Sequence, residues 1–236
     1  MQRGMLKKLV ILGTTGSGKT TFMKNLVGDF DGAEVARRVV IEEAQIINTF
    51  SPIAADQFEN STTTVSMNVK SVLFLTTRTN QFQYFPMTSD LELDKDNLDS
   101  VYPTVMFDTA GQERFSFMQE IGLNGADGVF IFADGTNIAS VERVSQFITM
   151  IKEEEEKKNK KIPTVVFVNK KDLESRGIYV GAASLSRWIT DEDIKIYETT
   201  NTDIETFMTP IRVFLNALEG FPIDAQLIFN SVHEVY

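Results

Sequence analysis

The sequence predicts an α/β fold in which helices cover both faces of a mostly parallel central sheet. Apolar runs with the length of buried strands alternate with segments of helical spacing; the runs are residues 6–12, 65–75, 103–107, 128–133, 163–168 and 194–197. This alternation is typical of parallel sheets. Polar motifs follow several of the runs, and binding sites in such folds lie at the carboxyl ends of the strands. With 236 residues, of which 42% are hydrophobic, the chain can bury one sizeable core.

A glycine-rich segment follows the first apolar run and fits the pattern G-x-x-x-x-G-K-[ST]. It consists of Gly13, Thr14, Thr15, Gly16, Ser17, Gly18, Lys19 and Thr20, and Thr21 opens the helical segment that comes next. The glycines allow a tight turn whose N–H groups point at phosphate oxygens, and the helix N-terminus adds a positive dipole. We expect Lys19 to reach the terminal phosphates and the Thr20 hydroxyl to ligate Mg²⁺. The segment predicts binding of a nucleoside polyphosphate.

A second motif, Asp-Thr-Ala-Gly-Gln-Glu, follows the apolar run at 103–107. Its aspartate, Asp108, would face the phosphate loop from the end of a buried strand and contact Mg²⁺ directly or through water. Gly111 has no side chain, so its N–H can approach a γ-phosphate closely. Gln112 would then orient an attacking water. The motif predicts a site that hydrolyses the terminal phosphate.

The motif Asn-Lys-Lys-Asp at 169–172 follows the apolar run at 163–168. The carboxylate of Asp172 can accept from both N–H groups on the edge of guanine, and Asn169 can fix the loop. Adenine offers no matching pair of donors, so this motif favours guanine.

These motifs, in this order, resemble those of the Ras-like small GTPase family, and the resemblance covers nearly all of residues 5–218. A cluster of threonines at 62–64 stands where the family has its first switch. The segments 62–67 and 112–118 are more similar to the prokaryotic branch, which is related to the bacterial polarity and gliding GTPases. The resemblance implies a P-loop GTPase domain, or G domain, that uses Mg²⁺ with GTP or GDP.

The resemblance also implies roles for single positions. The family's functional residues correspond to Lys19, Thr20, Asp108, Gly111, Gln112, Asn169, Lys170 and Asp172. Lys170 would lie along the base and ribose. The switch threonine that closes over Mg²⁺ is assigned to Thr64, with Thr63 as the alternative. Thr200 and Asn201 replace the family's usual Ser-Ala pair, which leaves their contact with the guanine oxygen open.

We interpret the whole chain as one G domain that departs from a minimal one at three places. The domain spans 1–236, with insertions at about 29–60 and 78–102 and a C-terminal extension at about 219–236. Helical spacing over 32–50 favours a lid or extra helix over a partner site. A strand-like aromatic piece at 82–85 predicts a hairpin, and the spacing at 225–232 predicts a helix that packs on the body or binds a partner.

The chain is acidic, with a net charge of −10, and therefore a poor ligand for nucleic acid. Its basic run, 157–161, follows four glutamates in the helical pattern over 138–158, and we interpret it as a solvated helix end. The absence of cysteine fits a cytoplasmic protein and removes prenylation and palmitoylation. Because no apolar stretch approaches the ~20 residues of a membrane helix, we expect no intrinsic membrane anchor.

The expected function is a switch that binds GTP, hydrolyses it slowly to GDP and changes its partner-binding surfaces. Hydrolysis would depend on Gln112, Gly111, Lys19 and Thr64. Protein effectors, a GTPase-activating protein and an exchange factor are the implied partners, and no arginine stands directly before Thr64 to replace the activating protein. One alternative is a GTP-binding structural subunit that does not switch, which would need none of Gln112, Gly111 and Thr64. Another is a P-loop kinase or ATPase, which would need lid arginines.

Overall fold

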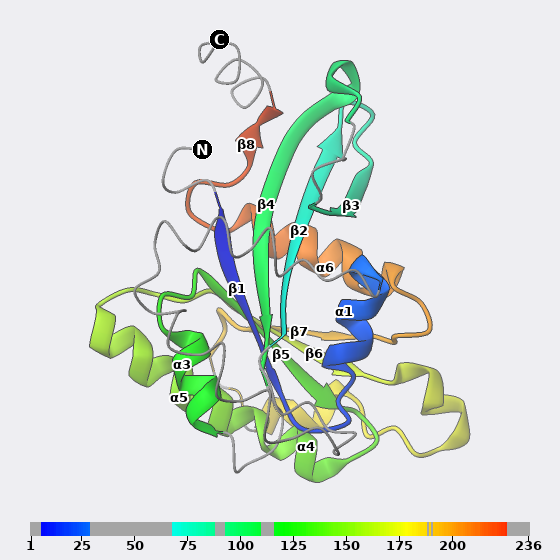
Figure 1. Cartoon of the computed structure of the whole chain (residues 1–236). Helices are drawn as coiled ribbons and strands as arrows, with labels where there is room; N and C mark the ends of the chain where they lie inside the picture. Colours follow the sequence, from blue (N-terminus) through cyan, green and yellow to red (C-terminus); the bar gives the residue numbers. More distant parts are fainter. Residues whose placement is uncertain are drawn as a thin grey trace, which may run out of the picture.

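The computed structural model describes residues 6–28, 68–87, 93–109, 116–187, 189 and 191–225. Within these ranges the chain forms one sheet with helices on both faces (Figure 1). The strands are β1 Lys7–Gly13, β2 Asn68–Thr77, β3 Phe82–Pro86, β4 Leu98–Asp108, β5 Gly128–Asp134, β6 Thr164–Asn169, β7 Lys195–Glu198 and β8 Ile223–Asp224. The α-helices are α1 Lys19–Val27, α3 Ser116–Leu123, α4 Ile138–Glu142, α5 Val144–Lys158 and α6 Glu205–Asn216. The 3₁₀ helices η2 Lys95–Asn97, η4 Lys171–Arg176 and η5 Ala182–Arg187 complete the described elements.

The sheet has the order β3-β2-β4-β1-β5-β6-β7, and β8 pairs with β4. Neighbouring strands from β4 through β1, β5 and β6 to β7 are parallel, whereas β2 is antiparallel to both β3 and β4. The prediction of a mostly parallel sheet is therefore confirmed. In Figure 1 the strands β1 and β5 point toward the lower edge, where β1 turns into α1.

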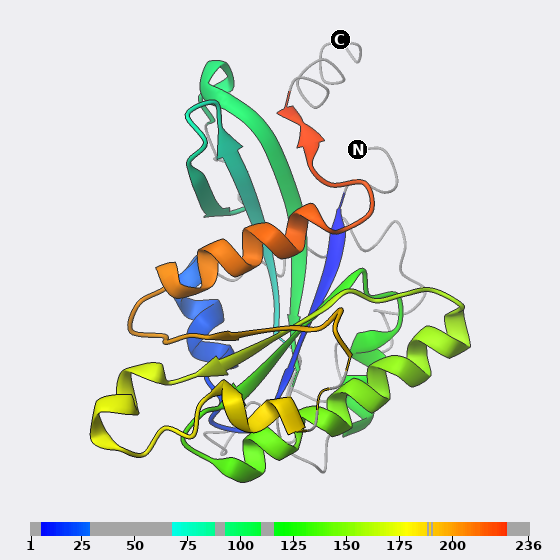
Figure 2. The ribbon, with the colours of Figure 1, turned by 180° about the vertical axis from the view of Figure 1, so that it is seen from behind.

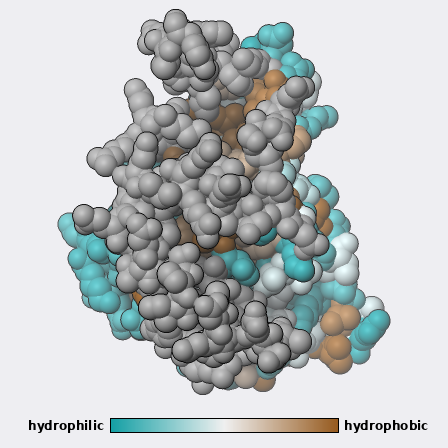
Figure 3. Space-filling view, in the orientation of Figure 1, coloured by the Kyte–Doolittle hydropathy of each residue, from teal (hydrophilic) through white to brown (hydrophobic). Residues whose placement is uncertain are grey.

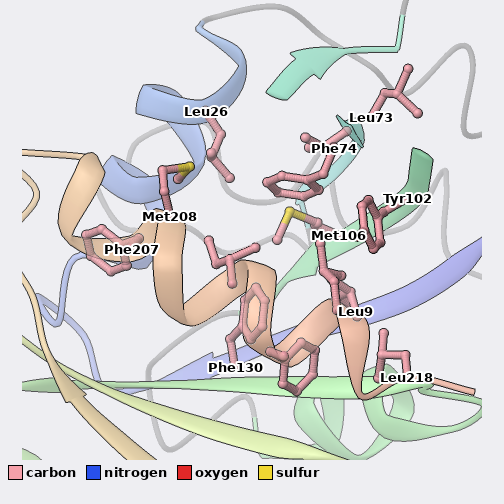
Figure 4. Packing of buried hydrophobic residues seen from close by; sticks show 14 of the residues in the cluster. Leu9, Leu26, Leu73, Phe74, Tyr102, Met106, Phe130, Phe207, Met208 and Leu218 are labelled. Carbon is pink, nitrogen blue, oxygen red and sulfur yellow. The ribbon is translucent and has the colours of Figure 1, made fainter. Parts of the chain in front are cut away.

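Each face of the sheet carries its own core. Alternate side chains of a strand point to opposite faces, so Leu9 and Ile11 pack with α1 and α6, while Val10 and Leu12 pack with α3, α4 and α5. Figure 2 shows α6 crossing the first of these faces. Here aromatic rings from α1, the sheet and α6 gather around Phe22, whose ring centroid lies 4.9 Å from that of Phe207. Figure 4 shows Phe207, Met208 and Phe130 in this core.

Two predicted elements differ in the structure. β4 begins at Leu98, before the predicted start at 103. The polar residue Ser100 interrupts the apolar run but pairs with Thr76 of β2 and Asp224 of β8, and Leu98 also pairs with β2. The helical pattern over 138–158 forms two helices, which meet at Arg143. There the Arg143 amide is shared between the carbonyls of Ala139 and Val141. The apolar stripe continues across this break through Val141 and Val144.

The predicted hairpin at 82–85 is present as β3, paired with β2. The first insertion, 29–60, and the C-terminal helix, from 226 onward, lie outside the described residues. At the end of α5 the basic run is exposed, and Lys160 and Lys161 pair with Asp127 and Glu155. Figure 3 shows this end of the molecule as a hydrophilic edge, as predicted for a solvated helix end. Among the described helices, none has the length and apolar character needed to cross a bilayer.

Candidate functional site

The structure brings most of the predicted site residues to one edge of the sheet. The glycine-rich loop joins β1 to α1, Asp108 ends β4, and the 169–172 motif begins at the last residue of β6. Thr200 and Asn201 follow β7. Thr64, Gly111 and Gln112 lie outside the described residues, so their roles stay predictions.

The glycine-rich loop needs glycine at Gly18, which has a left-handed backbone with φ 99° just before α1. A Cβ at this position would stand 2.1 Å from Asn169 Nδ2 and 2.4 Å from Asn201 Nδ2. Ser17 is fully buried, and its hydroxyl donates to the Thr14 carbonyl at 2.8 Å. The loop is therefore held by its own hydrogen bonds and by side chains of the other two motifs.

Lys19 is folded back over the loop. Its Nζ donates to the carbonyl oxygens of Gly13 at 2.8 Å and Thr14 at 2.9 Å, and only 6% of the residue is exposed. Burial lowers the pKa of Lys19 to about 8, although the negative charge of Asp108 raises it in part. Among the groups that affect this pKa, Asp108 is the negative charge near the buried ammonium of Lys19. The site is therefore suited to an anionic ligand, because phosphate oxygens would stabilise the charged form of the lysine.

Thr20 and Asp108 form a pair of oxygen ligands beside the loop. The Thr20 hydroxyl donates to Asp108 Oδ2 at 2.9 Å. Asp108 is 1% exposed, and its other oxygen, Oδ1, accepts no hydrogen bond from the residues that the structure describes. Burial raises the pKa of Asp108, while Lys19, Thr20 and Asn68 lower it. A hydroxyl and a buried carboxylate with a free oxygen fit Mg²⁺, so these two residues would hold the ion.

The 169–172 motif contacts the glycine-rich loop directly. Asn169, 1% exposed, donates from Nδ2 to the Ser17 carbonyl at 2.9 Å. Asp172 is exposed, and its Oδ1 accepts from the Thr200 hydroxyl at 2.5 Å. Asp172 thus has one oxygen already oriented by a neighbour and stands open to a ligand.

Asp134, the last residue of β5, belongs to this site although the sequence analysis missed it. Its Oδ2 pairs with Lys170 Nζ at 2.5 Å, and its Oδ1 accepts from the amide and hydroxyl of Thr136. Burial alone would raise the pKa of Asp134, but the hydrogen bonds from Lys170 and Thr136 hold it below the ordinary value. The available signal was its position, because it ends the apolar run at 128–133 as Asp108 ends another.

A second missed contact ties the loop to α4. The Thr14 and Ser140 hydroxyls lie 2.5 Å apart, and the Ser140 hydroxyl also accepts from the Asp134 amide at 2.9 Å. Nothing in the spacing of Ser140 distinguishes it from any other small helix residue, so sequence reasoning had no means of finding it.

Thr200 and Asn201, whose roles the sequence left open, face different parts of the site. Thr200 contacts Asp172, as described above, whereas Asn201 Nδ2 donates to the Gly18 carbonyl at 3.0 Å. Both therefore hold other site residues in place.

In a comparison with protein families, the model of the Ras family matches residues 66–212. The match covers more than half of the chain. It includes Asp108, the 169–172 motif and Thr200–Asn201, and it begins after the glycine-rich loop. No curated protein matches the chain.

Proposed function

The chain belongs to the Ras family, and on this premise we propose that it is a cytoplasmic switch that binds GTP and hydrolyses it to GDP. The observation that carries the proposal is the contact between its two nucleotide motifs. Asn169 of the base motif donates to the Ser17 carbonyl of the glycine-rich loop at 2.9 Å. Base and phosphates of one nucleotide would therefore meet a single connected site.

In this proposal Lys19 exchanges its bonds to the Gly13 and Thr14 carbonyls for bonds to phosphate oxygens. The exchange keeps the buried ammonium hydrogen-bonded while placing an opposite charge beside it, which is favourable at a buried site. Thr20 and Asp108 would hold Mg²⁺, which supplies positive charge that neutralises the phosphate oxygens when it is bound. Thr64 would complete this arrangement in the GTP state.

Hydrolysis is assigned to Gln112, which would orient the attacking water, and to the Gly111 N–H, which would bind the γ-phosphate. Among the described residues, no second cationic side chain contacts Lys19 or Asp108. The described part of the site therefore offers no arginine to stabilise the negative charge that develops on the phosphoryl oxygens in the transition state. In related enzymes an arginine from an activating partner accelerates the step about 10³- to 10⁵-fold. We therefore propose a slow intrinsic reaction, regulation by an activating protein and an exchange factor, and effectors that bind the GTP state.

Guanine selectivity is assigned to Asp172. The Thr200 hydroxyl occupies one lone-pair direction of Oδ1, so the carboxylate is oriented before the base arrives. A carboxylate oriented in this way favours a base with two donors on one edge, as guanine has. It therefore favours a GTPase over a kinase or an ATPase. Placement of the chain in the prokaryotic branch of small GTPases rests on the segments 62–67 and 112–118 and stays a hypothesis.

Single-turnover hydrolysis by the purified protein tests the proposal. We expect a rate well below ~10⁻² s⁻¹, the value for G proteins with an arginine in cis, and a further decrease in Gln112→Leu. Gln146→Leu, on the exposed side of α5, is the matched control and should hydrolyse GTP like the unmodified protein. If the unmodified protein binds GTP tightly but does not hydrolyse it, this result would instead support a structural subunit that does not switch.

A further inference from the structure

We propose that Asn201 is a positioning residue for the phosphate loop, and that the adjacent residues Thr200 and Asn201 serve the two halves of the site separately. Thr200 orients the carboxylate that would meet the base, and Asn201 orients the peptide that would meet the phosphates. The inference rests on the proposed function, because it concerns how that site would bind a guanine nucleotide.

The contacts of Asn201 reach both ends of α1, at Gly18 before its first turn and at Asn25 in its last. Its side-chain Nδ2 donates to the Gly18 carbonyl at 3.0 Å, and its backbone carbonyl accepts from Asn25 Nδ2 at 2.8 Å. The Asn25 contact fixes the backbone at position 201, so that the side chain is directed at Gly18 and not at solvent. Asn201 Oδ1 is buried and accepts no hydrogen bond from any described residue, so within this part of the chain the side chain is oriented by its donor.

Two neighbouring carbonyls of the loop are held in this way. Asn169 donates to the Ser17 carbonyl at 2.9 Å, and Asn201 donates to the next one, that of Gly18. The Gly18 carbonyl also accepts the helical bond from the Phe22 amide at 2.9 Å, so both of its lone pairs are used. Each carbonyl belongs to a peptide plane that it shares with the next residue's N–H.

A planar trans peptide carries its C=O and the following N–H on opposite sides. Holding the Ser17 and Gly18 carbonyls toward the asparagines therefore turns the N–H groups of Gly18 and Lys19 away from them. N–H groups at a helix N-terminus are the ones that bind phosphate. Asn201 thus sets the second of two peptide planes that would present donors to the nucleotide.

The residue type at position 201 decides whether this contact exists. A small apolar side chain, such as the one the resemblance would lead us to expect there, has no donor to reach the Gly18 carbonyl. Aspartate has the size of asparagine but only acceptor oxygens when ionised, so it would face the carbonyl without a hydrogen bond. Asn201→Ala and Asn201→Asp therefore remove the same interaction by different means.

The two variants are compared with Thr200→Val, which removes the neighbouring hydroxyl while keeping the shape of the side chain. GDP dissociation and the ³¹P resonance of bound GDP report on the phosphate loop, and the preference for GDP over xanthosine diphosphate reports on the base contact. Both Asn201 variants should release GDP roughly two- to tenfold faster, the effect of one lost hydrogen bond. Their β-phosphate resonance should move, while their base preference stays unchanged.

Thr200→Val should do the reverse, with reduced base preference and an unmoved β-phosphate resonance. Suppose that the unmodified protein binds GDP and that the Asn201 variants release GDP at the same rate and show the same β-phosphate resonance. This result would overturn the inference about Asn201 and leave the proposed function standing. Faster release without any change of the resonance would also overturn it, since that result indicates general loosening. An unmodified protein that binds no GDP would overturn the proposed function itself.

Discussion

Replacement of Gly18 by alanine tests whether the base motif and the phosphate loop share one structure. Gly18 lies at φ 99°, where an alanine costs about 1–2 kcal/mol relative to the right-handed helical region. Its new Cβ would also stand 2.1 Å from Asn169 Nδ2 and 2.4 Å from Asn201 Nδ2, closer than any non-bonded contact allows. The substitution therefore strains the backbone and displaces two amides at once.

The expected magnitude follows from these two effects. Displacing both amides removes their bonds to the Ser17 and Gly18 carbonyls, at about 0.5–1.5 kcal/mol each. Together with the backbone strain, the loop in its nucleotide-binding form loses about 2–5 kcal/mol. At 1.4 kcal/mol per factor of ten, GDP affinity should fall roughly 30- to 4,000-fold.

Titration with a fluorescent GDP derivative measures the effect, and Gly28→Ala provides the matched control. Gly28 also has a positive φ, 65°, but a Cβ there meets nothing within 4 Å. Because Gly28 has ψ −157°, in a backbone region almost exclusive to glycine, the control should lower the free energy of unfolding at least as much as Gly18→Ala does. It should leave GDP affinity within about threefold, because no site contact is displaced. If Gly18→Ala keeps GDP affinity within the same range, the asparagine contacts do not support the phosphate loop.

Three further substitutions probe separate parts of the molecule. Asp172→Asn should shift the preference from guanine to xanthine nucleotides in competition binding, whereas Asp193→Asn should not; equal binding of ATP and GTP by the unmodified protein would exclude the guanine assignment. Thr20→Ala should weaken GTP binding and make the remaining affinity insensitive to EDTA, in contrast to Thr149→Ala on α5, and unchanged EDTA sensitivity would contradict the metal site. Burial lowers the pKa of Lys8 to about 8, so between pH 8 and 10.5 the unfolded state binds more protons and the free energy of unfolding should rise with pH. In Lys8→Met this contribution should be missing, and denaturant unfolding with the same pH dependence in both proteins would refute it.

The order of the elements was predictable because the strands are short apolar runs and their ends carry distinctive residues. Val165, Val166 and Val168 predicted a buried strand, and Asn169 at its end predicted a binding loop. The strand β8 was not predictable, since its two residues are defined by pairing with Val101 and Ser100 of β4, far away in the sequence.

The residues of the site also differ in how far they could be predicted from the sequence. Residues in a motif of fixed local spacing, such as Lys19 and Thr20, could be selected from the sequence alone, and their roles stay predictions. Residues that act through a distant partner were missed or left open, because their partners are brought near only by the sheet. Asp134 meets Lys170 across the β5–β6 pair, and Asn201 meets Gly18 across the loop.

The edge of the sheet restricts how a partner can bind the proposed switch. From Val72 to Thr76, β2 pairs with β3 on one side and with β4 on the other, so its backbone hydrogen-bonding groups are already used along this stretch. A partner strand cannot be added to β2 there unless β3 first separates from it. Separation would expose Phe82, whose ring stacks on Phe74 at a centroid distance of 5.7 Å, as well as the paired backbone. Each lost hydrogen bond costs about 1 kcal/mol, and the exposed aromatic surface adds to this. A partner that recognises the GTP state must therefore bind in some way other than adding a strand to this stretch of β2.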